Sequence, residues 1–382
     1  MSRAAPSSNG KAVAGQESPQ AASIFNPVVD FLLVGGLSLI VLVPLLISGR
    51  ANLLFLSAGA QAYIATAINM PHFMASYRLV YGSREMIMRH KWASIYVPMI
   101  LVAYIGLALW DSQNSPALVI VLVAVASGYL AWHYTGQVWG MMASYAYLAG
   151  TTFERSERFL IRTGLRILLA WHVTWFLYTQ LQNGAAVRPL YVLISGGTLV
   201  AFLLGAIGII KVRRRIGRFP PARALVAWVA IFVWYAAMAR DPAALFWVQI
   251  AHALQYLAFP VRVELNRSAA KSNASRRRVV LHMAGYAIVL LVISIVVAQL
   301  VPLSIMGVVG NVFGDQPRRA APILLLMFIN IHHYFTDGVI WKISNPDVKR
   351  DLFAHVAAKR QVVAAPTAML PKVTGGPTKA RR

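Results

Sequence analysis

The chain has 382 residues, of which 58% are hydrophobic and only 13% charged, and its mean hydropathy is +0.60. A soluble domain carries about 25% charged residues, so this composition excludes an ordinary soluble protein and predicts one that crosses a membrane several times. The chain contains no cysteine, which excludes disulfides, iron–sulfur clusters and thiolate metal sites.

Taken in chain order, the sequence divides into a tail, a membrane domain and a second tail. Residues 1–25 are rich in Ser, Ala, Gly, Gln and Pro and predict a disordered N-terminal tail. A transmembrane helical domain is expected over 26–345, and 346–382 is expected to be a basic, largely disordered cytoplasmic tail.

Apolar stretches within the domain predict the transmembrane helices. They lie at about 28–49, 52–80, 93–110, 116–149, 159–180, 189–210, 223–240, 243–261, 280–301 and 320–343. Only Arg240-Asp241-Pro242 separates the seventh from the eighth, so these two are either full spans or a hairpin that does not fully cross. The predicted fold class is all-α, a polytopic bundle of about ten transmembrane helices.

The basic residues test this order of spans. The net charge is +24, from 36 Lys and Arg against 12 Asp and Glu. If the N-terminus is cytoplasmic and the spans alternate, 31 of the basic residues fall on the cytoplasmic side, and only Arg50, Arg188, Arg240, Arg318 and Arg319 fall opposite. This asymmetry predicts a multi-pass inner-membrane protein with both termini cytoplasmic, and it explains the basic charge without a nucleic-acid partner.

Histidines inside the spans are the candidate functional residues. His72, His133, His252 and the adjacent pair His332–His333 lie at or past the midpoint of four spans that run in the same direction. These histidines are therefore expected to meet in one layer of the bilayer. His172 lies on a span of opposite direction and ranks below them. The other three, in basic segments, are expected to be interfacial or solvated: His90, His282 and His355.

One helical turn from each of His72, His133, His252 and His333 lies an amide or carboxylate, which is where an acceptor for the second ring N–H is expected. These residues are Asn69, Gln137, Gln255, Asn330 and Asp337. Ser76 also shares a face with His72, and Gly338 is expected to let a neighbouring helix approach closely. The pattern predicts a metal held by His72, His133, His252 and His333.

Two residues are candidates for catalytic roles. Asp337 is expected to bind the metal or to accept a hydrogen bond from the second ring N–H of His333. The alternative is that Asp337 is an interfacial charge paired with Lys342 or Arg78. His332 is expected to line a substrate cavity or to serve a second ion. For any single histidine, the alternative is a hydrogen bond between helices.

All-imidazole ligation suits iron, copper or zinc, and the aromatic residues around the histidines favour an apolar cavity for a hydrophobic small molecule from the lipid bilayer. The motifs PHF (71–73), WHY (132–134), IAHALQY (250–256) and HHYF (332–335) resemble those of Brp/Blh-type bacterial carotenoid dioxygenases. Phe73 departs from the PHG form of that family's first motif. The resemblance implies an oxygenase with histidine-held non-haem Fe(II), acting on a carotenoid or other polyene.

Two other functions are compatible with the same histidines. Haem ligated by two of them would make an electron-transfer protein, and another divalent metal is also compatible. A transporter that relays protons through the histidines is the third reading, although the sequence shows no paired broken helices of the kind that many transporters have.

Overall fold

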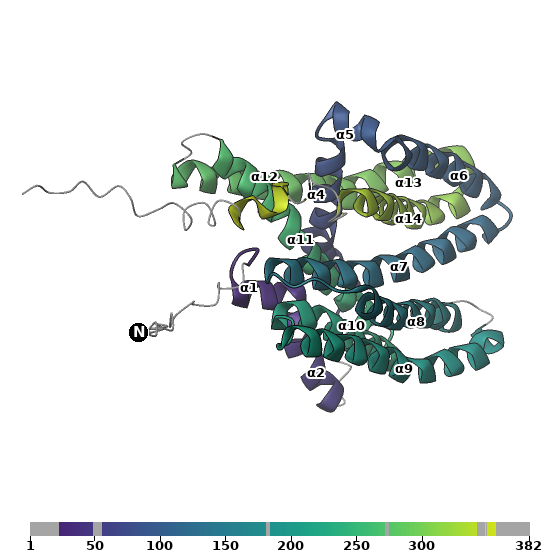
Figure 1. Cartoon of the computed structure of the whole chain (residues 1–382). Coiled ribbons are helices and arrows are strands. Elements are labelled where there is room, and N and C mark those ends of the chain that lie inside the picture. Colours follow the sequence, from purple (N-terminus) through teal and green to yellow (C-terminus); the bar gives the residue numbers. More distant parts are fainter. Residues whose placement is uncertain are drawn as a thin grey trace, which may run out of the picture.

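The structure is a computed structural model that describes residues 23–48, 56–180, 184–271, 275–341, 348 and 350–356. Every regular element in these ranges is a helix (Figure 1). The predicted all-α fold is therefore confirmed. Most of the two predicted tails, and Lys342, lie outside the described residues.

Each predicted span corresponds to one helical stretch, some of them divided by a wider π-helical turn (η). In chain order the elements are α1 (Pro27–Phe31), η1 (Leu32–Gly36), α2 (Leu37–Ser48), α3 (Ala58–Ile64), η3 (Ala65–Asn69), α4 (Met70–Tyr81), α5 (Arg84–Arg89), η4 (Trp92–Tyr96), α6 (Val97–Asp111), α7 (Ala117–Leu148), α8 (Arg155–Gln180), α9 (Gly184–Ile216), α10 (Ala222–Arg240), α11 (Ala244–Ala270), α12 (Arg276–Ile295), η5 (Val296–Leu300), α13 (Val301–Phe313) and α14 (Asp315–Ile340).

Eight of the helical stretches in the described part of the chain are long and apolar enough to cross a membrane. The α3–α4 and α8 stretches are not among these eight, because polar residues such as Asn69, His72 and Arg162 interrupt them. Both α10 and α11 are among the eight, so length and composition favour two spans there over a partial hairpin.

Three of the π-helical turns are each followed by a proline, two residues after the turn ends. Proline lacks an N–H and its ring clashes with the carbonyl four residues earlier, which favours a kink or a wider turn. In each case that earlier residue lies in the wider turn: Ala67 before Pro71 in η3, Ser94 before Pro98 in η4, and Ala298 before Pro302 in η5.

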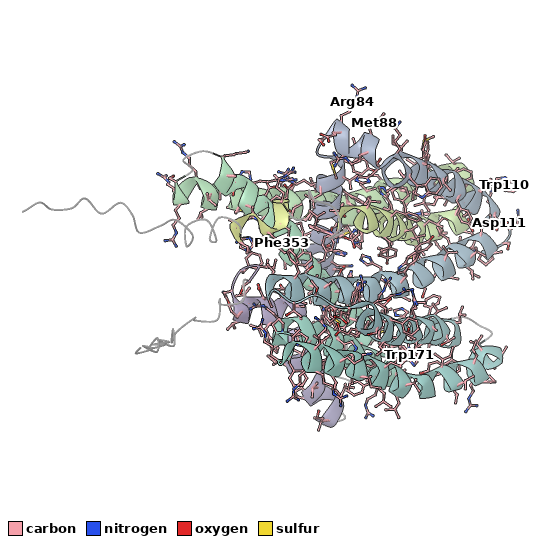
Figure 2. All side chains as sticks on the ribbon, viewed as in Figure 1. Arg84, Met88, Trp110, Asp111, Trp171 and Phe353 are labelled. Carbon is pink, nitrogen blue, oxygen red and sulfur yellow. The ribbon has the colours of Figure 1, made fainter. Side chains whose placement is uncertain are left out.

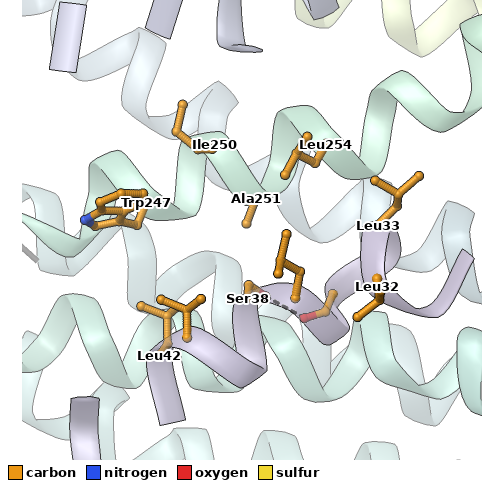
Figure 3. A pocket seen from close by; sticks show the side chains of 11 residues that line it. Leu32, Leu33, Ser38, Leu42, Trp247, Ile250, Ala251 and Leu254 are labelled. Carbon is orange, nitrogen blue, oxygen red and sulfur yellow. Dashed lines mark hydrogen bonds between the residues drawn. The ribbon is translucent and has the colours of Figure 1, made fainter. Parts of the chain in front are cut away.

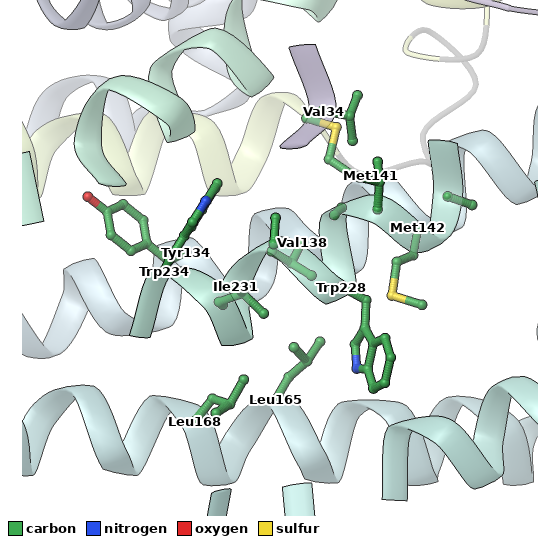
Figure 4. Packing of buried hydrophobic residues seen from close by; sticks show 14 of the residues in the cluster. Val34, Tyr134, Val138, Met141, Met142, Leu165, Leu168, Trp228, Ile231 and Trp234 are labelled. Atoms are coloured by element: carbon green, nitrogen blue, oxygen red, sulfur yellow. The ribbon is translucent and has the colours of Figure 1, made fainter. Parts of the chain in front are cut away.

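The main core lies among α7, α8 and α10 (Figure 4), where Val138, Leu165 and Ile231 are fully or almost fully buried. Small residues allow α8 and α9 to approach closely. A Cβ added at Gly164 of α8 would lie 2.4 Å from the carbonyl oxygen of Ala201 in α9. This hairpin therefore depends on glycine at the contact.

The helices that carry the candidate residues are neighbours. Helix α14 packs against α4, α6 and α7, and α11 packs against α4. A hydrogen bond from Gln137 of α7 to the carbonyl of His252, 3.1 Å long, joins α7 to α11. In Figure 1, α7 and α14 run along the bundle near α4 and α11, so these four helices can enclose one site.

Charged contacts gather several of the predicted cytoplasmic segments at one end. Glu264 of α11 pairs with Arg78 at 3.0 Å and with His282 at 2.7 Å, and Arg267 pairs with Asp351 at 2.8 Å. Figure 2 shows Phe353 away from the end that carries Trp110 and Asp111. These contacts agree with the charge-based order of spans, and sidedness across the membrane stays a prediction.

The chain beyond residue 345 is partly structured. Residues 350–356 are helical, Leu352 and Phe353 are buried in the main core, and the Asn266 side chain donates to the carbonyl of Asp351 at 2.8 Å. The ordered structure thus continues into the segment that the sequence predicts as a tail.

Gly164→Ala should destabilise the bundle, because the new methyl group meets backbone rather than a flexible side chain. Overpacking of this kind costs about 1–3 kcal/mol, which a lower melting temperature of the detergent-solubilised protein would report. Gly196→Ala in α9 is the control, since its Cβ meets no atom within 4 Å. Equal melting temperatures for the two variants would contradict the close approach of α8 and α9.

A reporter fused after Arg382 should be active only in the cytoplasm, because the predicted loop charges place both termini there. Paired reporters, one active only in the cytoplasm and one only in the periplasm, measure this directly. A periplasmic signal from the C-terminal fusion would overturn the proposed orientation.

Candidate metal centre

The four histidines predicted as ligands lie together, one from each of α4, α7, α11 and α14. Ring nitrogens of His72, His252 and His333 lie within 4.8 Å of one another. The ring centroid of His133 is 4.7 Å from that of His252 and 5.0 Å from that of His333. All four side chains are buried. The structure thus brings together the residues that matching depth predicts, while metal binding by them stays a prediction.

Five ring nitrogens in this group have no protein partner. They are Nε2 of His72, His133 and His333 and both ring nitrogens of His252, and all are buried. A buried polar group without a hydrogen bond costs about 1–3 kcal/mol, and folded proteins contain few of them. Convergent imidazole nitrogens with free lone pairs fit a divalent metal of the iron, copper or zinc type.

Hydrogen bonds at the other ring nitrogen fix the tautomers of two of these histidines. His72 donates from Nδ1 to the carbonyl of Asn69. Nδ1 of His333 lies 2.9 Å from Oγ of Ser76, whose hydroxyl donates to the carbonyl of Phe73 at 2.8 Å. Since that hydroxyl proton is already engaged, Nδ1 of His333 is the donor. Both histidines therefore present an unprotonated Nε2 to the centre, which is the form that binds metal.

Asp337 lies beside a different histidine. Its Oδ2 is 3.5 Å from Nδ1 of His133, and its Oδ1 is buried without a hydrogen-bond partner. This carboxylate can hold the Nδ1 proton of His133 and so direct Nε2 to the centre. The expected alternative partner Arg78 pairs with Glu264 instead.

The partners expected one turn away on the same helix differ from those in the structure. Asn69 accepts the hydrogen bond from His72 with its backbone carbonyl rather than with its side-chain amide. Gln137 donates to the carbonyl of His252 and to the amide oxygen of Gln255, and Gln255 donates to the carbonyl of Val34. Asn330 donates to the carbonyl of Leu326 and accepts from Tyr334.

Geometry between helices explains these differences. Residues four apart share a helix face, but their side chains lean the same way toward the N-terminus, so an imidazole reaches across the interface more readily than along its own helix. His333 of α14 therefore bonds Ser76 of α4, and not Asp337, which lies one turn away on its own helix. Its spacing in the sequence places Ser76 on the face of His72 and so points to the wrong histidine.

His332 faces away from the group. Its Nε2 lies 3.0 Å from the Tyr81 hydroxyl and 3.1 Å from the Ala93 carbonyl, and its ring stacks on Tyr77 with centroids 4.9 Å apart. These contacts tie α14 to α4 and η4, and the structure does not bring His332 to the four grouped imidazoles. Its predicted catalytic role has no geometric support.

His172 also stays outside the group, as its place on a span of opposite direction predicts. Its Nδ1 lies 3.2 Å from the Tyr235 hydroxyl. The ring of Tyr134 contacts both His172 and His252, with centroids 5.9 and 4.5 Å apart. Tyr134 therefore lies between His172 and the candidate centre.

A cavity of about 560 Å³ adjoins the group between α7 and α14. His133 and Asp337 line it, together with aromatic residues that include Trp132, Tyr256 and Phe335. Gly338 also lines it. A Cβ there would meet no atom within 4 Å, so the predicted close approach of another helix at Gly338 is wrong.

A second cavity, of about 110 Å³, lies between η1–α2 and α11 (Figure 3). Its walls are apolar apart from Ser38, whose hydroxyl donates to the carbonyl of Gly35 at 2.7 Å. None of the grouped histidines lines this cavity, so it has no visible link to the candidate centre.

Comparison with known proteins adds no relative: no protein-family model, no curated protein and no solved structure matches the chain. The function of the protein is therefore inferred from the geometry of its histidine group and the adjoining cavity.

Asp337→Asn should weaken metal binding by roughly 10–100-fold, the usual effect of removing a carboxylate that orients a histidine ligand. Competition with a chromogenic chelator measures this affinity. Thr336→Val is the control, since the Thr336 hydroxyl bonds only a carbonyl of its own helix, that of His333. Equally small effects from both variants would show that Asp337 does not support the centre.

Proposed function

We propose that the protein is an integral membrane oxygenase in which His72, His133, His252 and His333 hold Fe(II), acting on a hydrophobic molecule dissolved in the bilayer, such as a carotenoid or other polyene. The observation that carries the proposal is the convergence of buried, unpartnered imidazole nitrogens of His72, His252 and His333 from three helices, with the His133 ring of a fourth helix beside them. Ionisable groups within a membrane domain are expensive and usually functional.

Iron is the proposed metal because the donors are neutral imidazoles with a carboxylate behind one of them, and iron held in this way supplies redox chemistry with dioxygen. The chain itself contributes orientation and exclusion of water. Ser76 and the Asn69 carbonyl fix two tautomers, Asp337 can hold the Nδ1 proton of His133, and the rings of Tyr134, Tyr256 and Phe73 pack around the imidazoles.

The cavity supports a hydrophobic substrate. It reaches the proposed centre at His133 and Asp337, and most of its other walls are aromatic or aliphatic. The resemblance of the histidine motifs to Brp/Blh-type dioxygenases points to the same class of reaction. That resemblance covers short motifs, and Phe73 departs from it.

Haem is a weaker candidate for the same histidines. Bis-histidine ligation places a flat macrocycle between two facing imidazoles. In this bundle four imidazoles pack against one another with neighbouring ring centroids 4.7–5.5 Å apart, so other histidines occupy the space that the macrocycle would need.

Purified protein should contain iron without a sharp haem spectrum, and Ala replacement of His72, His252 or His333 should remove most of that iron. His172→Ala is the matched control, since His172 is an equally buried membrane histidine outside the group. Elemental analysis with an optical spectrum provides the measurement. Dioxygen consumption on addition of a polyene should be lost in the same three variants.

Two results would contradict the proposal. Equal metal content in His172→Ala and the three other variants would show that His72, His252 and His333 do not hold the metal. A full complement of iron with no dioxygen consumption on any polyene would contradict the oxygenase function but not the metal site.

A further inference from the structure

The cavity between α7 and α14 has a definite length. On α7 its lining residues lie along one helix face, from Tyr129 past His133, Gly136 and Gly140 to Ser144. Ser144 lies eleven positions after His133, which corresponds to about 16 Å at the rise of an α-helix. The cavity is therefore elongated along the helix, and His133, one turn from the Tyr129 end, adjoins the candidate metal centre.

Three glycines keep one wall of this cavity open. A Cβ at Gly140 or Gly338 would meet nothing within 4 Å, and one at Gly136 would meet only the Trp132 ring, at 3.8 Å. Gly136 and Gly338 are exposed, on the outside of helices that cross the bilayer. Each glycine lowers helix stability by about 1 kcal/mol relative to alanine. The open wall of the cavity therefore coincides with residues that are unfavourable for the helices themselves.

Polar groups lie at two places along the lining. His133, Gln137 and Asp337 lie near the candidate centre, and Ser144 lies at the other end of the α7 face. The Ser144 hydroxyl is buried, with 1% of the residue exposed, and it has no hydrogen-bond partner. Thr135 on the same helix shows the usual alternative, since its hydroxyl donates to the carbonyl of Ala131 at 2.9 Å.

We infer that this cavity binds an elongated, mostly apolar molecule whose far end carries a hydroxyl or carbonyl oxygen that hydrogen-bonds to Ser144. The molecule enters from the bilayer through the gap bounded by Gly136 and Gly338. A hydroxyl side chain can donate to a carbonyl or accept from an alcohol, so either oxygen satisfies the buried Ser144. The other end then lies beside His133 and Asp337.

The identity of the reacting end depends on the proposed function, because it assumes that chemistry occurs at the histidine group. Binding in the cavity does not depend on it. A binding experiment on metal-free protein therefore tests the cavity separately from the metal.

The probes are diphenylhexatriene, a rod-shaped hydrocarbon, and its derivative with a terminal hydroxymethyl group. Energy transfer from tryptophan measures the saturable binding of each probe to the full chain in detergent with a chelator, since Trp132 and Trp341 line the cavity. The wild-type protein should bind the hydroxymethyl probe about 3- to 10-fold more tightly than the hydrocarbon, the effect of one hydrogen bond.

Ser144→Ala should remove this preference, so that the two probes bind with about equal affinity. Ser127→Ala should keep it, because Ser127 is also buried on α7 with an unpartnered hydroxyl but does not line the cavity. The same preference in wild type and Ser144→Ala would overturn the assignment of Ser144.

Gly140→Leu should abolish saturable binding of both probes by filling the open space, and Gly338→Leu should do the same from the opposite helix. Gly128→Leu is the control, because a Cβ at Gly128 also meets nothing within 4 Å and Gly128 does not line the cavity. Unchanged probe binding in both cavity variants would overturn the binding site. Iron content measured on parallel samples shows whether the proposed metal centre fails independently.

Discussion

Burying an imidazole nitrogen without a hydrogen-bond partner costs about 1–3 kcal/mol, and the bundle buries such nitrogens on four histidines whose rings lie against one another. Lipid and apolar side chains cannot satisfy these atoms. A ligand that binds several of these nitrogens would offset the free-energy cost of burying them. The proposed function of the protein depends on this constraint.

The surrounding structure holds the four rings in place through their outer nitrogens and through the helix packing. Ser76, the Asn69 carbonyl and Asp337 lie against Nδ1 of three different histidines. Helix α14 packs on both α4 and α7, so it brings together helices that are far apart in the sequence. The π-helical turn η3 directly precedes α4, and π-helical turns are frequent at functional sites.

Much of the fold follows from the sequence because one strong rule governs it. A helix that crosses hydrocarbon needs about 20 apolar residues, and each predicted span has a helical counterpart in the structure. Grouping of the histidines also follows, since equal depth on co-directional helices limits where side chains can meet. Gly338 shows the limit of that reasoning, because the sequence cannot say whether a glycine admits a helix or leaves a cavity.

The hydrogen-bond partners cannot be derived from the sequence in the same way. Spacing along one helix identifies residues that share a face, but it does not say which neighbouring helix lies against that face. For this reason spacing pairs Ser76 with the wrong histidine, and it pairs Asp337 with His333 rather than His133. The side to which His332 turns depends on the position of η4, which the span order alone does not fix.

X-ray absorption at the iron edge of the purified protein is the decisive measurement for the histidine centre, because it counts the ligands of the metal. Ligation by the grouped histidines predicts a nitrogen-dominated shell with the outer scattering pattern of three or four imidazoles, reduced by one imidazole or lost in His252→Ala. A spectrum without imidazole scattering, or one that is unchanged in His252→Ala, would contradict it.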